Sequence, residues 1–188
     1  MSQVISFEQQ AVARLRARLG AAEEANEDLI AFARGHSGAV ASINQAVLEA
    51  IEAPTIEALL DVITGRWPEI LAIDSAAVAL VVGSRAFRAD GAAVEQVEPE
   101  FVERMMRAVA PVEVRSIETG HPLFGMREGR AIRAEALIRI DGPVPYPHGL
   151  LALGQKAELA VGSHHGSALL HFLGQVIAAA IRRFVATA

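Results

Sequence analysis

The stretch from Gly149 to Phe184 constrains the fold most, because it joins a strand pattern to a helix pattern. The apolar run between two glycines, Gly149 to Gly154, has the length and composition of a buried strand. After a polar connection, apolar residues recur at helical spacing over about four turns: Leu169, Phe172, Leu173, Val176, Ile177, Ala180, Ile181 and Phe184. A buried strand that leads into such a helix needs a sheet beside it and another helix against it. The rest of the chain must supply both.

The composition narrows the classes of function. Net charge is −5 over 188 residues with both signs interspersed, which gives no electrostatic reason to expect nucleic-acid binding. Cysteine is absent, which excludes disulfides, thiolate nucleophiles, cysteine-ligated zinc and thioether-linked chromophores. The first ten residues lack a signal-peptide core, and no apolar run reaches the ~18 residues of a membrane span. We therefore expect a cytoplasmic protein that binds neither nucleic acid nor membrane.

The N-terminal region, Ser6 to Ala53, predicts one long helix or two helices end to end. Its heptad stripe favours a coiled coil, with a polar residue at one core position that can fix register and favour two strands. We predict a homodimer whose interface comprises Val12, Leu15, Leu19, Asn26 and Leu29. The alternative is a surface helix that packs on its own domain. Because the segment Gly35 to Gly38 weakens the pattern, we expect residues 1–34 to form the coiled coil and residues 35–188 the globular domain.

Prolines and apolar runs in the middle of the chain predict where helices begin and end and where strands lie. Pro54 should end the first helix, and Thr55 can cap the next one. The run Ala76 to Val82 is apolar on both faces, which fits a central strand, and Arg85 to Ala89 can return as a short strand. Pro99 should lie in the first turn of a further helix.

The remaining segments predict a pocket border and a hairpin. Residues 112–129 are irregular and glycine-containing, so they can border a pocket at the surface. Residues 131–140 alternate like a half-buried strand, and the proline-rich turn at 141–147 leads back to the strand at Gly149. The order of elements predicts an α+β sandwich, with the first and last helices on one face of an antiparallel sheet.

Several of these segments together resemble a known family. The strand 149–154, the C-terminal helix with Phe172-Leu173-Gly174, and the stretches 43–48, 55–60 and 76–82 resemble the bacterial GAF-like family of unknown function, DUF484. The resemblance runs from about Glu27 onward. It implies a PAS/GAF-type antiparallel sheet flanked by helices after a long N-terminal helix. It also implies a sensory and dimerisation module, with a small-molecule pocket on the sheet face away from the terminal helices. Genes of the family often neighbour a tyrosine recombinase, which implies a protein partner in chromosome maintenance. The Asn-Lys-Phe-Asp-Glu pattern of cyclic-nucleotide-binding GAF domains has no clear counterpart here.

Arginines near the irregular loop suggest the ligand. If the loop borders a pocket, Arg130 and Arg133 are its concentrated positive charge, and guanidinium groups hold carboxylates or phosphates well. The pocket would be walled by Phe101, Met105, Val78 and Leu80. We expect a small anionic ligand and no cofactor. The alternative is that the arginines are structural: their charge on an edge strand would prevent aggregation, and Arg133 would pair with Glu135.

Catalytic and metal-binding patterns are weak. His164, His165 and His171 lie close in sequence but lack helical ligand spacing and nearby carboxylates, so we expect no metal site. No nucleophile elbow, paired carboxylates or phosphate loop can be assembled. The preferred hypothesis is a non-enzymatic sensory or scaffolding module. The alternatives are a small cytoplasmic enzyme that uses residues 112–129 as a lid, and a protein-interaction adaptor without a ligand.

Overall fold

The computed structural model describes residues 37–142, 147–158 and 167–186. The compact unit begins at Ser42. The predicted coiled coil, with its interface residues Val12, Leu15, Leu19, Asn26 and Leu29 and its boundary at residue 34, lies outside the described residues.

The unit is built on one antiparallel sheet of six strands in the order β3-β2-β1-β6-β5-β4. The strands are β1 Ser75–Val82, β2 Arg85–Ala89, β3 Val94–Val97, β4 Val112–Ser116, β5 Ala134–Ile140 and β6 His148–Gln155. The hairpin predicted from the C-terminal pattern is present, since Ile140 pairs with Gly149. The central pair places Val78 opposite Leu151. The edge strands β3 and β4 were not expected from the sequence.

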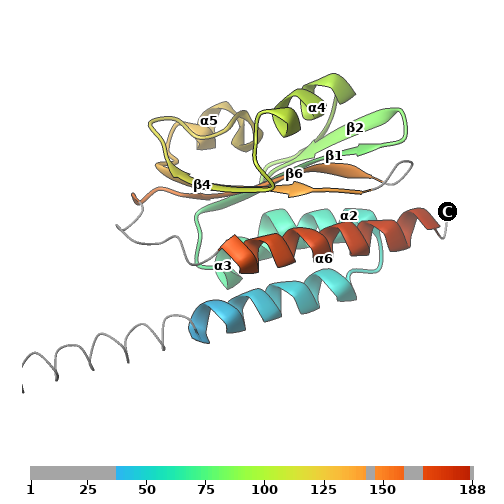
Figure 1. The fold of residues 1–188 in the computed structure, drawn as a ribbon, viewed down its shortest axis with the longest axis horizontal. Coiled ribbons are helices and arrows are strands. Elements are labelled where there is room, and N and C mark those ends of the chain that lie inside the picture. Colours follow the sequence, from blue (N-terminus) through green and yellow to red (C-terminus); the bar gives the residue numbers. More distant parts are fainter. Residues whose placement is uncertain (1–36, 143–146, 159–166, 187–188) are drawn as a thin grey trace, which may run out of the picture. The chain divides into compact units, whose positions relative to one another are not determined.

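Helices cover both faces of the sheet (Figure 1). They comprise a helix over residues 37–52, α2 Ile56–Asp61, the π-helical turn η1 Val62–Arg66, α3 Trp67–Ile70, α4 Pro99–Arg107, the 3₁₀ turn η2 Pro122–Phe124, α5 Gly125–Gly129 and α6 Ser167–Ala186. The helices α2, α3 and α6 lie below the sheet in Figure 1, whereas α4 and α5 lie above it. The expectation that the terminal helices share one face is confirmed, because side chains of residues 43–50 and of α6 enter the same core.

Two helix starts follow the predicted local chemistry. The hydroxyl of Thr55 accepts the backbone N–H of Ala58 at 3.2 Å, which caps α2 after Pro54 has ended the preceding helix. Pro99 occupies the first turn of α4, where its missing N–H costs no helical hydrogen bond.

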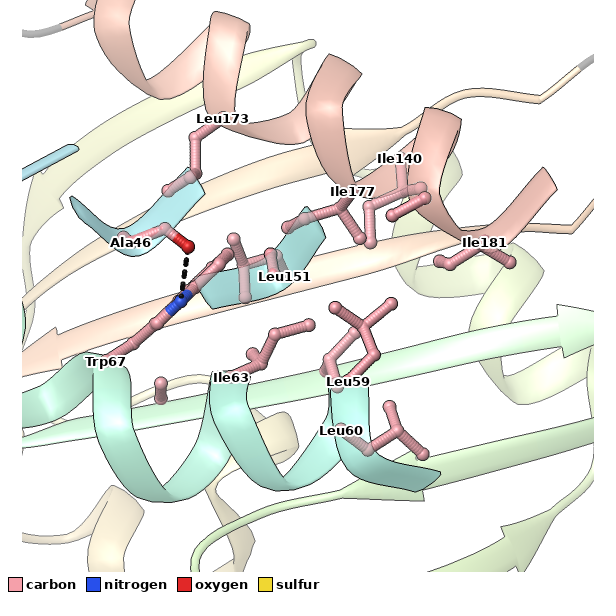
Figure 2. Packing of buried hydrophobic residues seen from close by; sticks show 14 of the residues in the cluster. Ala46, Leu59, Leu60, Ile63, Trp67, Ile140, Leu151, Leu173, Ile177 and Ile181 are labelled. Atoms are coloured by element: carbon pink, nitrogen blue, oxygen red, sulfur yellow. Dashed lines mark hydrogen bonds between the residues drawn. The ribbon is translucent and has the colours of Figure 1, made fainter. Parts of the chain in front are cut away.

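The larger core lies between the sheet and the terminal helices (Figure 2). The only tryptophan, Trp67, is fully buried there, and its indole N–H donates to the carbonyl oxygen of Ala46 at 3.1 Å. Ile177 of α6 joins Leu151 of β6 in this core. The first helix also contributes Ile43, Ala46, Val47 and Ala50. This part of the first helix therefore packs on its own domain, as both interpretations expected for the residues after Gly38.

A second core lies on the opposite face, beneath α4 and α5. The central strands present small side chains there, including Ala77, Ala79 and Ala152. Met105 of α4 and Phe124 of η2 fill the space that these alanines leave. This face also carries a large cleft.

Candidate functional site: a cleft between the β2–β3 hairpin, α4 and α5

A cleft of about 850 Å³ opens beside α5, and we call it the α5 cleft. One wall comes from the β2–β3 hairpin, the second from the start of α4, and the third from the segment Thr119 to Arg130. Its apolar surface is formed by Ala92, Val97, Phe101, Pro122, Phe124 and Met126. Its volume and mixed lining are typical of small-molecule sites.

A buried arginine forms the charged end of the cleft. The side chain of Arg88 on β2 is only 10% exposed. Its Nε donates to the carbonyl oxygen of Leu123 at 2.9 Å, its Nη1 donates to Glu95 at 3.0 Å, and its Nη2 pairs with Asp90. A buried guanidinium is stable only with such partners. Arg88 therefore fixes the hairpin against η2.

The turn after β2 and a glycine of α5 shape this end of the cleft. The Oδ1 atom of Asp90 accepts the backbone N–H groups of Ala92 and Ala93 at 2.9 and 3.1 Å, an Asx-type turn. Gly125 has φ +74°, and a Cβ at this position would lie 2.7 Å from Nη2 of Arg88. Both the backbone conformation and the space beside Arg88 require glycine here.

Two further arginines of the cleft have no side-chain partner in the described part of the chain. Arg127 and Arg130 of the α5 segment line the cleft and are exposed. Neither makes a side-chain hydrogen bond or an ion pair within the described part of the chain. Glu128 lies between them in sequence and pairs with Lys156 at 3.9 Å. Asp90 and Glu95 are paired with Arg88, so Arg127 and Arg130 are the cleft arginines whose N–H donors have no carboxylate partner within the described residues.

A second charged cluster holds the segment that leads into the cleft. The carboxylate of Glu135 on β5 is fully buried, and it accepts from Nε of Arg115 at 2.8 Å and from the backbone N–H of His121 at 2.7 Å. Burial works to lower the pKa of Arg115, but its contacts with Glu135 and Glu113 outweigh burial and raise the pKa. Burial lowers the pKa of His121, which Glu135 partly opposes and Arg115 reinforces. The cluster thus fastens residue 121 to the sheet.

The structure brings together part of the predicted ligand site. Phe101 and Arg130 both line the α5 cleft. Met105 lies in the core beneath the cleft, 7% exposed, and does not line it. Arg133 is turned toward the loop backbone, where its Nη1 donates to the carbonyl oxygens of Glu118, Arg130 and Ile132 at 3.2, 2.8 and 2.9 Å.

The expected positions of Val78 and Leu80 must be corrected. Both side chains belong to the larger core, on the face of the terminal helices, whereas their neighbours Ala77 and Ala79 face α4. Successive side chains of a strand point to opposite faces, and β1 is buried on both faces, so its apolar sequence does not show which set faces which layer. The expected ion pair between Arg133 and Glu135 is also absent from the described residues, because the carboxylate of Glu135 pairs with Arg115 instead.

Arg88 and Asp90 are the residues that sequence reasoning missed. The sequence carried one signal: in a strand, Asp90 lies two residues after Arg88 and therefore on the same face, where the two can pair. The burial of this face is visible only in the folded chain, where Ala86 is buried.

The histidines do not assemble a catalytic or metal site in the described regions. The ring of His121 accepts the backbone N–H of Leu123 at Nδ1, and only its backbone N–H meets Glu135. His171 contacts Gln175, whereas His164 and His165 lie outside the described residues. Among residues 37–142, 147–158 and 167–186, no group of three His, Asp or Glu side chains is placed to hold a metal ion.

Within the same ranges, no helix is long and apolar enough to cross a bilayer.

Comparison with known proteins identifies relatives of the fold. A family model described as "Protein of unknown function, DUF484" matches residues 1–186. No curated protein matches the chain.

Among solved structures, the GAF domain of a putative sensor histidine kinase from Pseudomonas syringae pv. tomato is 14% identical with a TM-score of 0.55, covering 85% of this chain and 95% of that one. The GAF domain of a phosphoenolpyruvate-protein phosphotransferase from Coxiella burnetii is 17% identical with a TM-score of 0.54, covering 80% and 96%. A bacteriophytochrome from R. palustris is 12% identical with a TM-score of 0.52, covering 78% and 38%. At these identities the structural likeness shows a GAF-like fold.

Proposed function

Since the chain belongs to the DUF484 family and has a GAF-like fold, we propose that it is a cytoplasmic sensory module that binds a small anionic ligand in the α5 cleft. Phe101 supplies an apolar wall for the body of the ligand, and Arg127 and Arg130 attract its anionic group. The module is not an enzyme in this proposal, and its output is a change in contacts with another protein.

The observation that carries the proposal is that Arg127 and Arg130 line the cleft beside an apolar surface and have no side-chain partner in the described part of the chain. A guanidinium presents planar N–H donors that match carboxylate and phosphoryl oxygens. A ligand with an anionic group and an apolar body satisfies both parts of the lining. A cation would be repelled, and a neutral ligand would gain weaker hydrogen bonds from these arginines than an anion would.

Native mass spectrometry of the protein as purified tests the proposal. The expected result is a bound small acid or phosphate ester that is lost in an Arg127→Ala, Arg130→Ala double variant. The control is Arg107→Ala, which removes an exposed charge on α4 that does not line the cleft. Loss of the same ligand from the control variant, or retention by the double variant, contradicts the proposed site.

The module acts as a homodimer in this proposal, paired through Val12, Leu15, Leu19, Asn26 and Leu29. Exposed apolar side chains on the terminal helices support pairing: Leu48 is 59% exposed, Ile51 47% and Phe172 44%. Light scattering of the full chain should give twice the mass of one chain. The double variant Val12→Asp, Leu19→Asp should have the mass of a single chain. A wild-type protein with the mass of one chain would contradict dimerisation.

An adaptor without a ligand is the second candidate, and the same exposed apolar residues favour it. It predicts that the arginine double variant keeps its protein partners. The sensory module predicts instead that partner capture changes when the anion site is removed.

A further inference from the structure

We propose that Glu95 is a built-in competitor for the anion site: its carboxylate binds Nη1 of Arg88, and an anionic ligand that enters the α5 cleft takes its place. This inference rests on the proposed function and adds which cation the ligand reaches. The ligand class is a carboxylate or phosphoryl oxyanion on a flat apolar body, which suits a cleft that has Phe101 and Val97 in its lining.

The partners of Arg88 differ in how firmly they are held. Asp90 is 14% exposed, and its second oxygen is committed to the backbone N–H groups of Ala92 and Ala93. Leu123 contributes a backbone carbonyl from η2. Glu95 is 59% exposed, and Arg88 is its only side-chain partner in the described chain. Glu95 is therefore the partner that can leave without disturbing the fold.

The position of Glu95 on an edge strand makes this exchange easy. Glu95 lies directly opposite Arg88 in the β2–β3 register, and side chains alternate along β3, so Glu95 and Val97 line the cleft whereas Val94 does not. Only the carboxylate side of this ion pair is exposed, so water can solvate Glu95 when it leaves, while Asp90 and the Leu123 carbonyl remain bound to Arg88. The carboxylate of Glu95 can rotate into solvent while Arg88 stays in place.

The charge around Arg88 determines which class of ligand can replace Glu95. Arg88 has five N–H donors and three acceptor groups, Leu123, Asp90 and Glu95, so donors remain for an oxyanion. An anion that displaces Glu95 leaves the charge around this buried guanidinium unchanged. A neutral ligand would remove a counter-charge without replacing it, which disfavours its binding at Arg88.

Titration of the full-length chain with benzoate, followed by NMR at low ionic strength, tests the exchange. In Glu95→Gln the competing charge is absent, while the amide oxygen can still accept from Arg88. The dissociation constant for benzoate should fall about fivefold or more, in the range of typical coupling between sites. The neutral analogue benzamide should show no such gain. Glu100→Gln is the matched control, because it removes the same charge from an exposed position outside the cleft and should leave benzoate binding within about twofold of wild type.

Each outcome decides the inference. Equal benzoate affinity of wild type and Glu95→Gln overturns the competitor role, and the proposed function stands if binding still requires Arg127 and Arg130. An equal gain in Glu100→Gln also overturns it, since net charge alone would then explain the effect. If neither benzoate nor phenyl phosphate binds any of the three proteins, both the competitor role and the anion site are contradicted.

Discussion

The Nε atom of Arg88 on β2 donates to the carbonyl oxygen of Leu123 at 2.9 Å, across 35 residues of sequence. This bond joins the β2–β3 hairpin to the η2–α5 segment, so two of the three walls of the cleft depend on one buried side chain. The ion pair with Asp90 adds the turn after β2 to the same network.

Replacing Arg88 should therefore destabilise the domain. In Arg88→Met the apolar stem remains, but Asp90 and the Leu123 carbonyl lose their partner. Removing one member of a buried pair costs about 3–5 kcal/mol, and the partial exposure of Asp90 argues for the lower end. Urea unfolding measures the change. Arg107→Met, on an exposed part of α4, should stay within about 0.5 kcal/mol of wild type, and equal effects of the two substitutions would refute the role of Arg88.

Substitution of Gly125 should destabilise the protein through the backbone. Gly125→Ala places a side chain at φ +74° and brings a Cβ within 2.7 Å of Arg88, so we expect a loss of about 1–3 kcal/mol in the free energy of unfolding. Gly65→Ala is the matched control, because a Cβ there has nothing within 4 Å and the residue lies in helical structure. That control should be neutral or stabilising by up to about 1 kcal/mol. Thermal unfolding of both variants checks the difference, and a neutral Gly125→Ala contradicts it.

His121 should make stability depend on pH in a defined direction. Burial lowers its pKa in the folded chain, so the unfolded chain binds the proton more readily between the folded pKa and the ordinary value of about 6.5. Stability from this residue is thus lost as pH falls through about 6.5, and the loss ends below the folded pKa. His121→Asn keeps an acceptor for the Leu123 N–H but does not titrate. Urea unfolding from pH 8 to pH 5 should show a smaller acid loss in the variant; parallel curves would contradict the assignment.

The sequence was most informative where local chemistry decides the structure. Pro54 with Thr55 located a helix boundary, Pro99 located the start of α4, and the glycine-framed run at 149–154 located β6. Each signal depends on a backbone constraint that acts within a few residues. The α+β class and the shared face of the terminal helices followed from the order of these elements.

The site depended on information that is not local. The sequence does not show which layer Val78 and Leu80 face, because a strand buried on both sides has no polar alternation to orient it. The edge strand β3 is largely exposed, so its composition resembles a loop. The partners of Arg88 come from β2, β3 and η2, and only the folded chain brings them together.

The most direct test of the central claim is an NMR titration of the ¹⁵N-labelled full-length protein with benzoate. The account predicts saturable shifts confined to amides that line the α5 cleft, from Gly125 to Arg130 and around Phe101. It also predicts that these shifts weaken at least tenfold in apparent affinity in the Arg127→Ala, Arg130→Ala variant, as expected when about 1.4 kcal/mol or more of binding free energy is lost. Shifts spread over unrelated surfaces, or an unchanged titration in the double variant, would contradict the assignment of this cleft as an anion-binding site.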